Sequence, residues 1–195
     1  MDVKTIAVIG AGIMGRGIAY AAAFAGYRTI LEDFSRTTLD RSVEWIKLVF
    51  DEGVSNGTVD ARTRDTALAQ LTTANSAEDA SREADLIIEA VPEEMEMKIE
   101  LFTIFDKFAK PGAIFASNTS SLSITEMAAV TFCPERCIGM HFRNPVPQMK
   151  LLELVKGTET SEDTISTCRE VGRRMGKEVV VVHEALGLLS GQHER

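Results

Sequence analysis

A glycine-rich segment near the amino terminus constrains the fold of this chain more than any other feature of its sequence. Residues 10–15 are Gly-Ala-Gly-Ile-Met-Gly, which fits the pattern G-x-G-x-x-G. An apolar, β-branched run over residues 3–9 precedes the pattern, and an alanine-rich run over residues 13–25 follows it. Residues 28–32 then form a second apolar run. This order predicts that the first 33 residues fold as one strand–helix–strand unit.

The chemistry of a dinucleotide site explains each part of this unit. Gly10 permits a tight turn, Gly12 allows the backbone to approach a pyrophosphate, and Gly15 lets the helix pack closely on the strand. Asp33, at the end of the second strand, can accept hydrogen bonds from a ribose 2′-hydroxyl and would repel a 2′-phosphate. NAD is therefore the expected cofactor, although the nearby Arg36 leaves NADP open. The predicted cofactor contacts of the loop are Gly10, Ala11, Gly12, Ile13, Met14 and Gly15.

The remaining sequence alternates between apolar strands and amphipathic helices. A helical hairpin is expected from Ser35 to Leu71, with its second helix starting near Asp60. Further strands are expected at residues 85–90, 113–116, 137–141, 151–155 and 178–182, with helices at 92–108 and 161–175. This pattern predicts an α/β fold, a Rossmann-type doubly wound and mainly parallel sheet with the helical hairpin inserted.

Composition excludes several classes of protein. The 195 residues contain 21 Lys and Arg against 29 Asp and Glu, a formal net charge of −8, which argues against a nucleic-acid binder. No apolar stretch is long enough for a membrane span and no signal peptide is evident, so a cytoplasmic protein, or one of a reduced organelle matrix, is expected. The cysteines are only Cys133, Cys137 and Cys168, which predict neither a disulfide framework nor a metal site.

Two polar segments follow predicted strands, where an open α/β sheet places its ligands. His141 ends one strand, and Glu153 lies on the next strand beyond a proline-rich loop. If the chain returns on itself, Glu153 could fix the tautomer of His141, which would then exchange a proton with a substrate. An unrelated His and Glu remain the alternative. Residues 117–121, Ser-Asn-Thr-Ser-Ser, could orient a carbonyl or hydroxyl group, or cap a helix near Ile124.

Five segments together resemble the amino-terminal NAD-binding domain of the 3-hydroxyacyl-CoA dehydrogenase family, which includes the bacterial 3-hydroxybutyryl-CoA dehydrogenases. They are GAGIMGRGIA from Gly10, the acid Asp33, DLIIEAVPE from Asp85, FASNTSSL from Phe115 and GMHFRNPVPQMKLLELV from Gly139. The resemblance implies NAD-dependent oxidation of an L-3-hydroxyacyl-CoA to a 3-ketoacyl-CoA, or the reverse, with an acyl-CoA as the substrate. A role in the β-oxidation of fatty acids is implied as well.

The resemblance also implies roles for individual residues. His141 matches the family's catalytic base, Glu153 its orienting acid, and Ser120 the serine near the reacting oxygen. Positions around the nicotinamide half of the cofactor are matched by Glu93, Lys98 and Asn144. No metal ligand is implied.

The sequence departs from the family near its carboxyl end. Gly191 stands where an asparagine normally helps to polarise the substrate carbonyl, with Ser190 as a weak substitute. We expect residues 1–184 to form the NAD-binding domain and residues 185–195 to be an altered or truncated link to a helical domain. A homodimer is one possibility, although the helical domain that normally carries the dimer interface in the family is missing from this sequence. Two alternatives also remain: a related 3-hydroxyacid dehydrogenase of the L-gulonate type, and an NAD-binding domain with little turnover.

Overall fold

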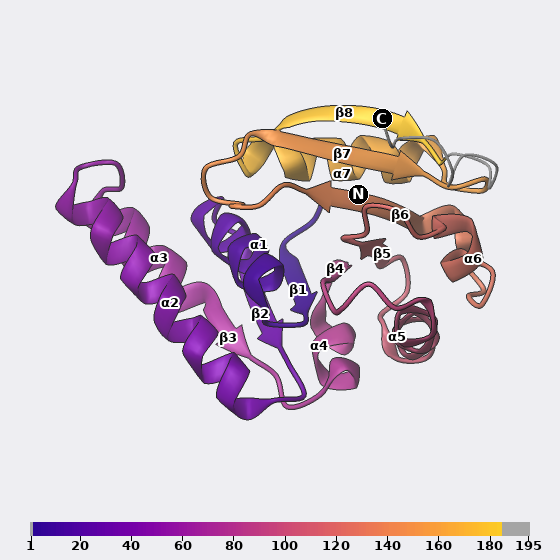
Figure 1. The fold of residues 1–195 in the computed structure, drawn as a ribbon, viewed down its shortest axis with the longest axis horizontal. Coiled ribbons are helices and arrows are strands. Elements are labelled where there is room, and N and C mark those ends of the chain that lie inside the picture. Colours follow the sequence, from indigo (N-terminus) through magenta and orange to yellow (C-terminus); the bar gives the residue numbers. More distant parts are fainter. Residues whose placement is uncertain (1, 185–195) are drawn as a thin grey trace, which may run out of the picture.

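The computed structural model describes residues 2–184, which form one eight-stranded sheet with helices on both faces (Figure 1). The strand order is β3-β2-β1-β4-β5-β6-β7-β8. The strands are β1 (Thr5–Ile9), β2 (Arg28–Glu32), β3 (Leu71–Thr73), β4 (Leu86–Glu89), β5 (Ile114–Ser117), β6 (Cys137–Phe142), β7 (Leu151–Lys156) and β8 (Glu178–His183).

The helices account for most of the remaining residues. They are α1 (Ile13–Phe24), α2 (Arg36–Ser55), α3 (Ala61–Gln70), α4 (Ala77–Glu83), α5 (Met95–Phe108), α6 (Ile124–Ala128) and α7 (Glu162–Arg174), with a short 3-10 helix at Pro134–Arg136. None of the helices in residues 2–184 is long and apolar enough to cross a membrane. The expected link at residues 185–195 lies outside the described residues.

All neighbouring strands are parallel except β6 and β7, which are antiparallel. The chain reverses its direction of winding between β1 and β4, so two sets of strands are built outward from this central pair. In such sheets the reversal opens a crevice at the carboxyl ends of the strands. The predicted Rossmann-type fold is confirmed.

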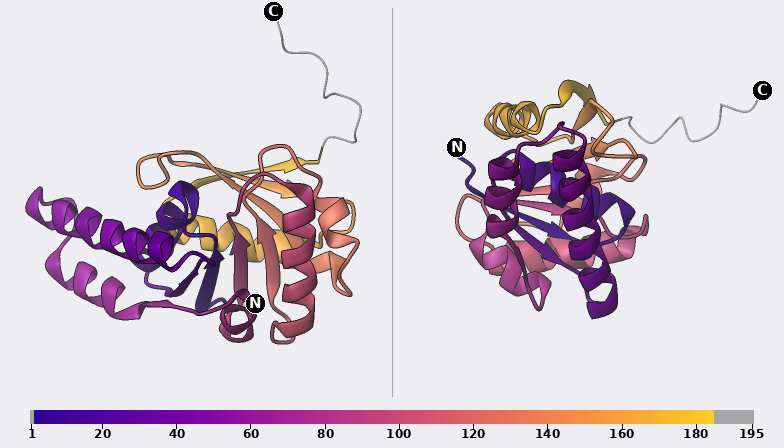
Figure 2. Two further views of the ribbon diagram at one scale, coloured as in Figure 1. Left: turned by 60° about the horizontal axis from the view of Figure 1, so that its bottom comes forward. Right: turned by 90° about the vertical axis from the view of Figure 1, so that its left-hand side faces the viewer.

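Alternate residues of β1 face two separate hydrophobic cores. Ile6 and Val8 pack in the core that includes residues of α1, α2, α3 and α7. Ala7 and Ile9 pack on the other face, with residues of α4, α5 and α6. Burial on both faces explains why the central strands are continuous apolar runs. The α2–α3 hairpin was correctly predicted, and it extends beyond one side of the sheet (Figure 2).

Two elements were missed, and one boundary was wrong. Leu71 was expected in the second hairpin helix, but it starts β3, whose three residues are partly or fully exposed at the edge of the sheet. Helix α4 has the polar sequence AEDASRE and buries only Ala77, Ala80 and Ser81, so it lacks the apolar stripe that marks a helix. Helix α5 begins at Met95, three residues later than expected.

Candidate active site

The carboxyl ends of the central strands border a cavity of about 540 Å³. Its walls come from segments that lie far apart in the sequence. They include Met14 from the glycine loop, Glu93 beyond β4, Asn118 and Ser120 beyond β5, and His141 and Asn144 at the end of β6. Five of the residues predicted from the sequence therefore line one cavity: Met14, Glu93, Ser120, His141 and Asn144. A second cavity of about 530 Å³, beside Val3 and Arg28, contains none of them.

The glycine loop leaves open space in front of helix α1. Gly10 has a φ of +98°, and a Cβ there would lie 2.8 Å from the carbonyl oxygen of Ala90. A Cβ on Gly15 would lie only 1.7 Å from the carbonyl oxygen of Gly10, whereas a Cβ on Gly12 would meet nothing within 4 Å. Gly10 and Gly15 therefore permit the shape of the loop, and Gly12 keeps clear the approach to the free N–H groups of α1. This arrangement fits a pyrophosphate.

Asp33 ties the end of β2 to the glycine loop. Its Oδ2 accepts a hydrogen bond from the backbone N–H of Ala11, and its Oδ1 accepts one from Ser35, both at 2.8 Å. A carboxylate can accept about four hydrogen bonds in all, so Asp33 can also bind ribose hydroxyls. Arg36, which left NADP open, forms an ion pair at 3.0 Å with Asp40 one helical turn away.

Glu32, next to Asp33, makes the stability of the domain depend on pH. Burial and the charges of Asp33 and Glu78 raise the pKa of Glu32 from 4.5 to about 7. From pH 4.5 to 7 the folded state therefore keeps a proton that the unfolded state loses, and the free energy of unfolding falls as pH rises. Above pH 7 this loss of stability is complete and is on the order of 3 kcal/mol.

We expect Glu32→Gln to remove the loss of stability that ionisation of Glu32 causes. Its melting temperature should exceed that of the parent protein above pH 7, and the advantage should vanish below pH 4.5. Thermal unfolding across this range is the measurement. Glu178→Gln, at an exposed position of β8, is the matched control. An equal gain at all pH values would refute a titration of Glu32.

The antiparallel pairing of β6 with β7 places His141 directly opposite Glu153. His141 Nδ1 and Glu153 Oε2 are 2.8 Å apart, and Arg143 donates a hydrogen bond to the same oxygen at 2.7 Å. Within residues 2–184, no hydrogen bond involves Nε2 of His141. The contact anticipated from the sequence is therefore present, with one ring nitrogen held by a carboxylate on a wall of the cavity. Arg143 was not anticipated.

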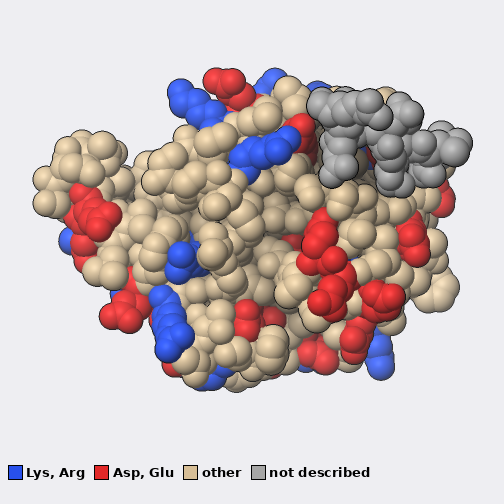
Figure 3. All heavy atoms as spheres, in the orientation of Figure 1, with Lys and Arg blue, Asp and Glu red and all other residues tan. Residues whose placement is uncertain are grey.

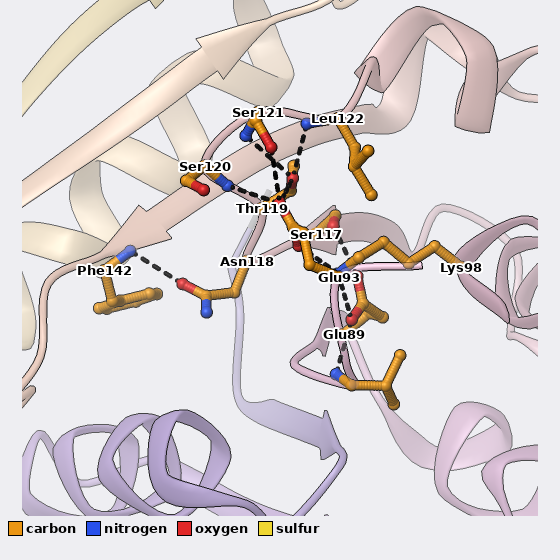
Figure 4. Close-up of polar contacts among 11 residues, drawn as sticks. Glu89, Glu93, Lys98, Ser117, Asn118, Thr119, Ser120, Ser121, Leu122 and Phe142 are labelled. Atoms are coloured by element: carbon orange, nitrogen blue, oxygen red, sulfur yellow. Dashed lines mark hydrogen bonds and ion pairs between the residues drawn. The ribbon is translucent and has the colours of Figure 1, made fainter. Parts of the chain in front are cut away.

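The segment after β5 is held by Glu93 (Figure 4). Glu93 Oε1 accepts hydrogen bonds from Thr119 Oγ1, from the backbone N–H of Ser120 at 3.1 Å and from Ser121 Oγ at 3.3 Å. Capping of helix α6 falls to Ser123, which accepts a hydrogen bond from the N–H of Glu126, so the capping alternative for residues 117–121 is wrong.

Asn118 links this segment to the strand that carries His141. Its Oδ1 accepts a hydrogen bond from the backbone N–H of Phe142 at 2.9 Å, and its own N–H donates to the carbonyl oxygen of Glu89. The ends of β4, β5 and β6 are thereby joined around the cavity. The sequence shows that Asn118 follows a strand, which made it a candidate for the site. Its partners on β4 and β6 could be identified only from the order of the strands in the sheet.

Two buried lysines contact residues close to the cavity without lining it. Lys98 is fully buried, does not line the cavity, and forms an ion pair at 2.8 Å with the fully buried Glu89. Lys177 donates hydrogen bonds to the carbonyl oxygens of Val146 at 2.5 Å and Met149 at 2.8 Å, which fixes the loop after β6. Glu89 and Lys177 were missed, because a lysine or glutamate in a sequence is normally read as exposed.

The described residues contain no other obvious reactive centre. All three cysteines are buried and free, and burial raises the pKa of each thiol. Within residues 2–184 no three His, Cys, Asp or Glu side chains form a group that could hold a metal ion. On the face shown in Figure 3, acidic side chains gather over the region of α4 and α5, while lysines and arginines are scattered.

Comparison with known proteins identifies the domain. Residues 5–185 match the family described as "3-hydroxyacyl-CoA dehydrogenase, NAD binding domain". The chain belongs to this family. Among its relatives, a probable 3-hydroxybutyryl-CoA dehydrogenase of Bacillus subtilis is 39% identical over 192 residues, covering 98% of this chain and 67% of the relative. A 3-hydroxybutyryl-CoA dehydrogenase of Bradyrhizobium diazoefficiens is 41% identical, covering 92% of this chain and 61% of the relative.

Solved structures give the same result. The crystal structure of 3-hydroxybutyryl-CoA dehydrogenase from Escherichia coli K12 superimposes with a TM-score of 0.91 at 38% identity, covering 94% of this chain and 39% of that one. The expected family is confirmed, and with it NAD as the cofactor of this 3-hydroxyacyl-CoA dehydrogenase domain. The chain spans two thirds or less of the length of these relatives.

Proposed function

We propose that this domain catalyses the NAD-dependent interconversion of an L-3-hydroxyacyl-CoA and the corresponding 3-ketoacyl-CoA. One observation carries the proposal: His141, held by Glu153, lines the same cavity as Met14 of the nucleotide-binding loop. A general base at His141 would lie beside the nicotinamide end of a bound dinucleotide. The names of the relatives, 3-hydroxybutyryl-CoA dehydrogenases, support a short acyl-CoA as the substrate.

The chain's own residues supply proton transfer and orientation. In the oxidation, Nε2 of His141 removes the proton of the substrate's 3-hydroxyl group, and Glu153 stabilises the imidazolium through Nδ1. Ser120, which also lines the cavity, offers a hydroxyl group to the same substrate oxygen. Bound NAD supplies the hydride acceptor for C3. In the reduction, protonated His141 returns the proton to the forming alkoxide.

Cofactor contacts follow from the same geometry. The N–H groups of residues 10–15 bind the pyrophosphate, and Asp33 binds the adenosine ribose. Glu93 and Asn144, which line the cavity, contact the nicotinamide half, and Lys98 acts on that half through Glu93. The proposed setting is the cytoplasm, and a homodimer built through a helical partner domain remains part of the proposal.

The test is the reduction of acetoacetyl-CoA, followed by the loss of NADH absorbance. The chain should be assayed beside a version extended by a helical domain from a 3-hydroxybutyryl-CoA dehydrogenase. Turnover in either form supports the proposal, and turnover only in the extended form would show that the acyl-CoA site needs both domains. NADH binding without any turnover would indicate a binding domain. Action on free hydroxyacids but not on thioesters would indicate the L-gulonate type.

A further inference from the structure

Two carboxylates share one buried ammonium group beside the cavity (Figure 4). The side chains of Glu89 and Lys98 are fully buried, and Lys98 Nζ lies 2.8 Å from each carboxylate oxygen of Glu89. The same Nζ lies 3.3 Å from Oε2 of Glu93, whose side chain is 39% exposed and lines the cavity. The ammonium group is therefore divided between a hidden carboxylate and one that faces the ligand.

The hydrogen bonds of Glu89 are those of an ionised carboxylate. Besides the two contacts from Lys98, it accepts hydrogen bonds from Ser117 Oγ at 2.5 Å and from the N–H of Val91 at 2.7 Å. Burial raises the pKa of Glu89 above its usual value, and the charge of Lys98 and these donors offset only part of that rise. Because all four of these bonds are donated to Glu89, a proton on this carboxyl would displace one of its partners.

Glu93 is ionised as well. Burial opposes its charge, but the hydrogen bond from Thr119 and the charge of Lys98 lower the pKa of Glu93 below its usual value. The three side chains then carry two negative charges and one positive charge, an excess of one negative charge. Across the cavity Arg143 is paired with Glu153 at 2.7 Å, so those two charges cancel.

We infer that the buried Glu89–Lys98 pair keeps Glu93 electrically uncompensated, and that this charge makes the site prefer the oxidised, positively charged nicotinamide ring over the reduced, neutral one. The inference rests on the proposed function, which places the ring in the cavity beside His141. Without Glu89, the ammonium group of Lys98 would have Glu93 as its one carboxylate partner. The charges of Lys98 and Glu93 would then cancel. Glu89 is thus a positioning residue for charge, which acts through Lys98 and has no contact with the cavity.

The test is the ratio of dissociation constants for NAD+ and NADH, measured on the full chain by NADH fluorescence and by its displacement with NAD+. We expect Glu89→Gln to raise the ratio Kd(NAD+)/Kd(NADH) about threefold to tenfold, because one nearby negative charge is lost. Damage to the shape of the site would weaken both forms alike, since they differ only in the nicotinamide ring.

The double variant Glu89→Gln/Lys98→Met is the matched control. It removes the buried pair as a unit, which folded proteins often tolerate, and it leaves Glu93 with its full charge. Its ratio should return to within about twofold of the parent value. If Glu89→Gln alone does not fold, Glu93→Gln serves instead, because its partly exposed side chain carries the same charge into the cavity. It should raise the ratio in the same direction.

Two results would overturn the inference: an unchanged ratio in the single variant that folds, or an equal rise in the single and double variants. Both leave the proposed function intact. The proposed function alone would be contradicted by a different result. In that result the variants change the ratio of dissociation constants as expected, but neither the chain nor its version extended by a helical domain reduces acetoacetyl-CoA. A parent chain that binds neither nucleotide would contradict both.

Discussion

His141→Ala should lower kcat for acetoacetyl-CoA reduction by at least about a hundredfold, because a positioned general acid typically contributes 10²- to 10⁴-fold. The affinity for NADH should stay within about twofold, since the imidazole is held by Glu153 and not by the nucleotide loop. The measurement is steady-state kinetics on the active form of the enzyme, together with NADH titration.

A second histidine provides the control for this variant. His183 lies at the end of β8, is exposed and does not line the cavity, so His183→Ala should leave kcat unchanged. Glu153→Gln should fall between the two, because the tautomer of His141 loses its carboxylate partner while the imidazole remains. Parent-like turnover in His141→Ala would remove this histidine from the mechanism and require another acid in the cavity.

The sequence predicted best those residues whose partners lie close to them along the chain. The glycine loop and Asp33 belong to one strand–helix–strand unit, so spacing alone was enough to place them. His141 and Glu153 are twelve residues apart on two consecutive strands, and a short return between neighbouring strands is common. These features could be predicted because the chain between them is short and regular.

The residues that sequence missed act across strands. Glu89 was missed because it reads as the polar end of a strand. Lys98 was named from the resemblance, but its burial was missed because it reads as one charge on an amphipathic helix. Their burial is visible only when α5 is packed against β4, because a lysine is buried only when a partner is present. Lys177 contacts a loop about 30 residues away, and nothing in its own segment signals that contact. Strand β3 and helix α4 were missed because neither has an apolar pattern of its own.

The largest expected effect on stability comes from Gly15→Ala. Its new Cβ would lie 1.7 Å from the carbonyl oxygen of Gly10 and 2.8 Å from the carbonyl carbon, so backbone must move. Both atoms belong to the turn between β1 and α1, which also contacts the end of β4. We expect the free energy of unfolding to fall by more than about 3 kcal/mol, at the upper end of the range for overpacked sites. Urea denaturation without nucleotide measures this loss.

Gly12→Ala should weaken nucleotide binding and leave stability almost unchanged, whereas Gly15→Ala should lower stability. The two variants are therefore controls for each other. The backbone of Gly12 has a φ of −64°, and a Cβ there would meet nothing within 4 Å, so stability without nucleotide should change by less than about 0.5 kcal/mol. The same methyl group would occupy the space through which a pyrophosphate reaches the N–H groups of α1. Affinity for NADH should therefore fall at least about tenfold. Unchanged NADH affinity in Gly12→Ala would mean that the open space at the start of α1 does not receive the cofactor, whatever the stability of Gly15→Ala.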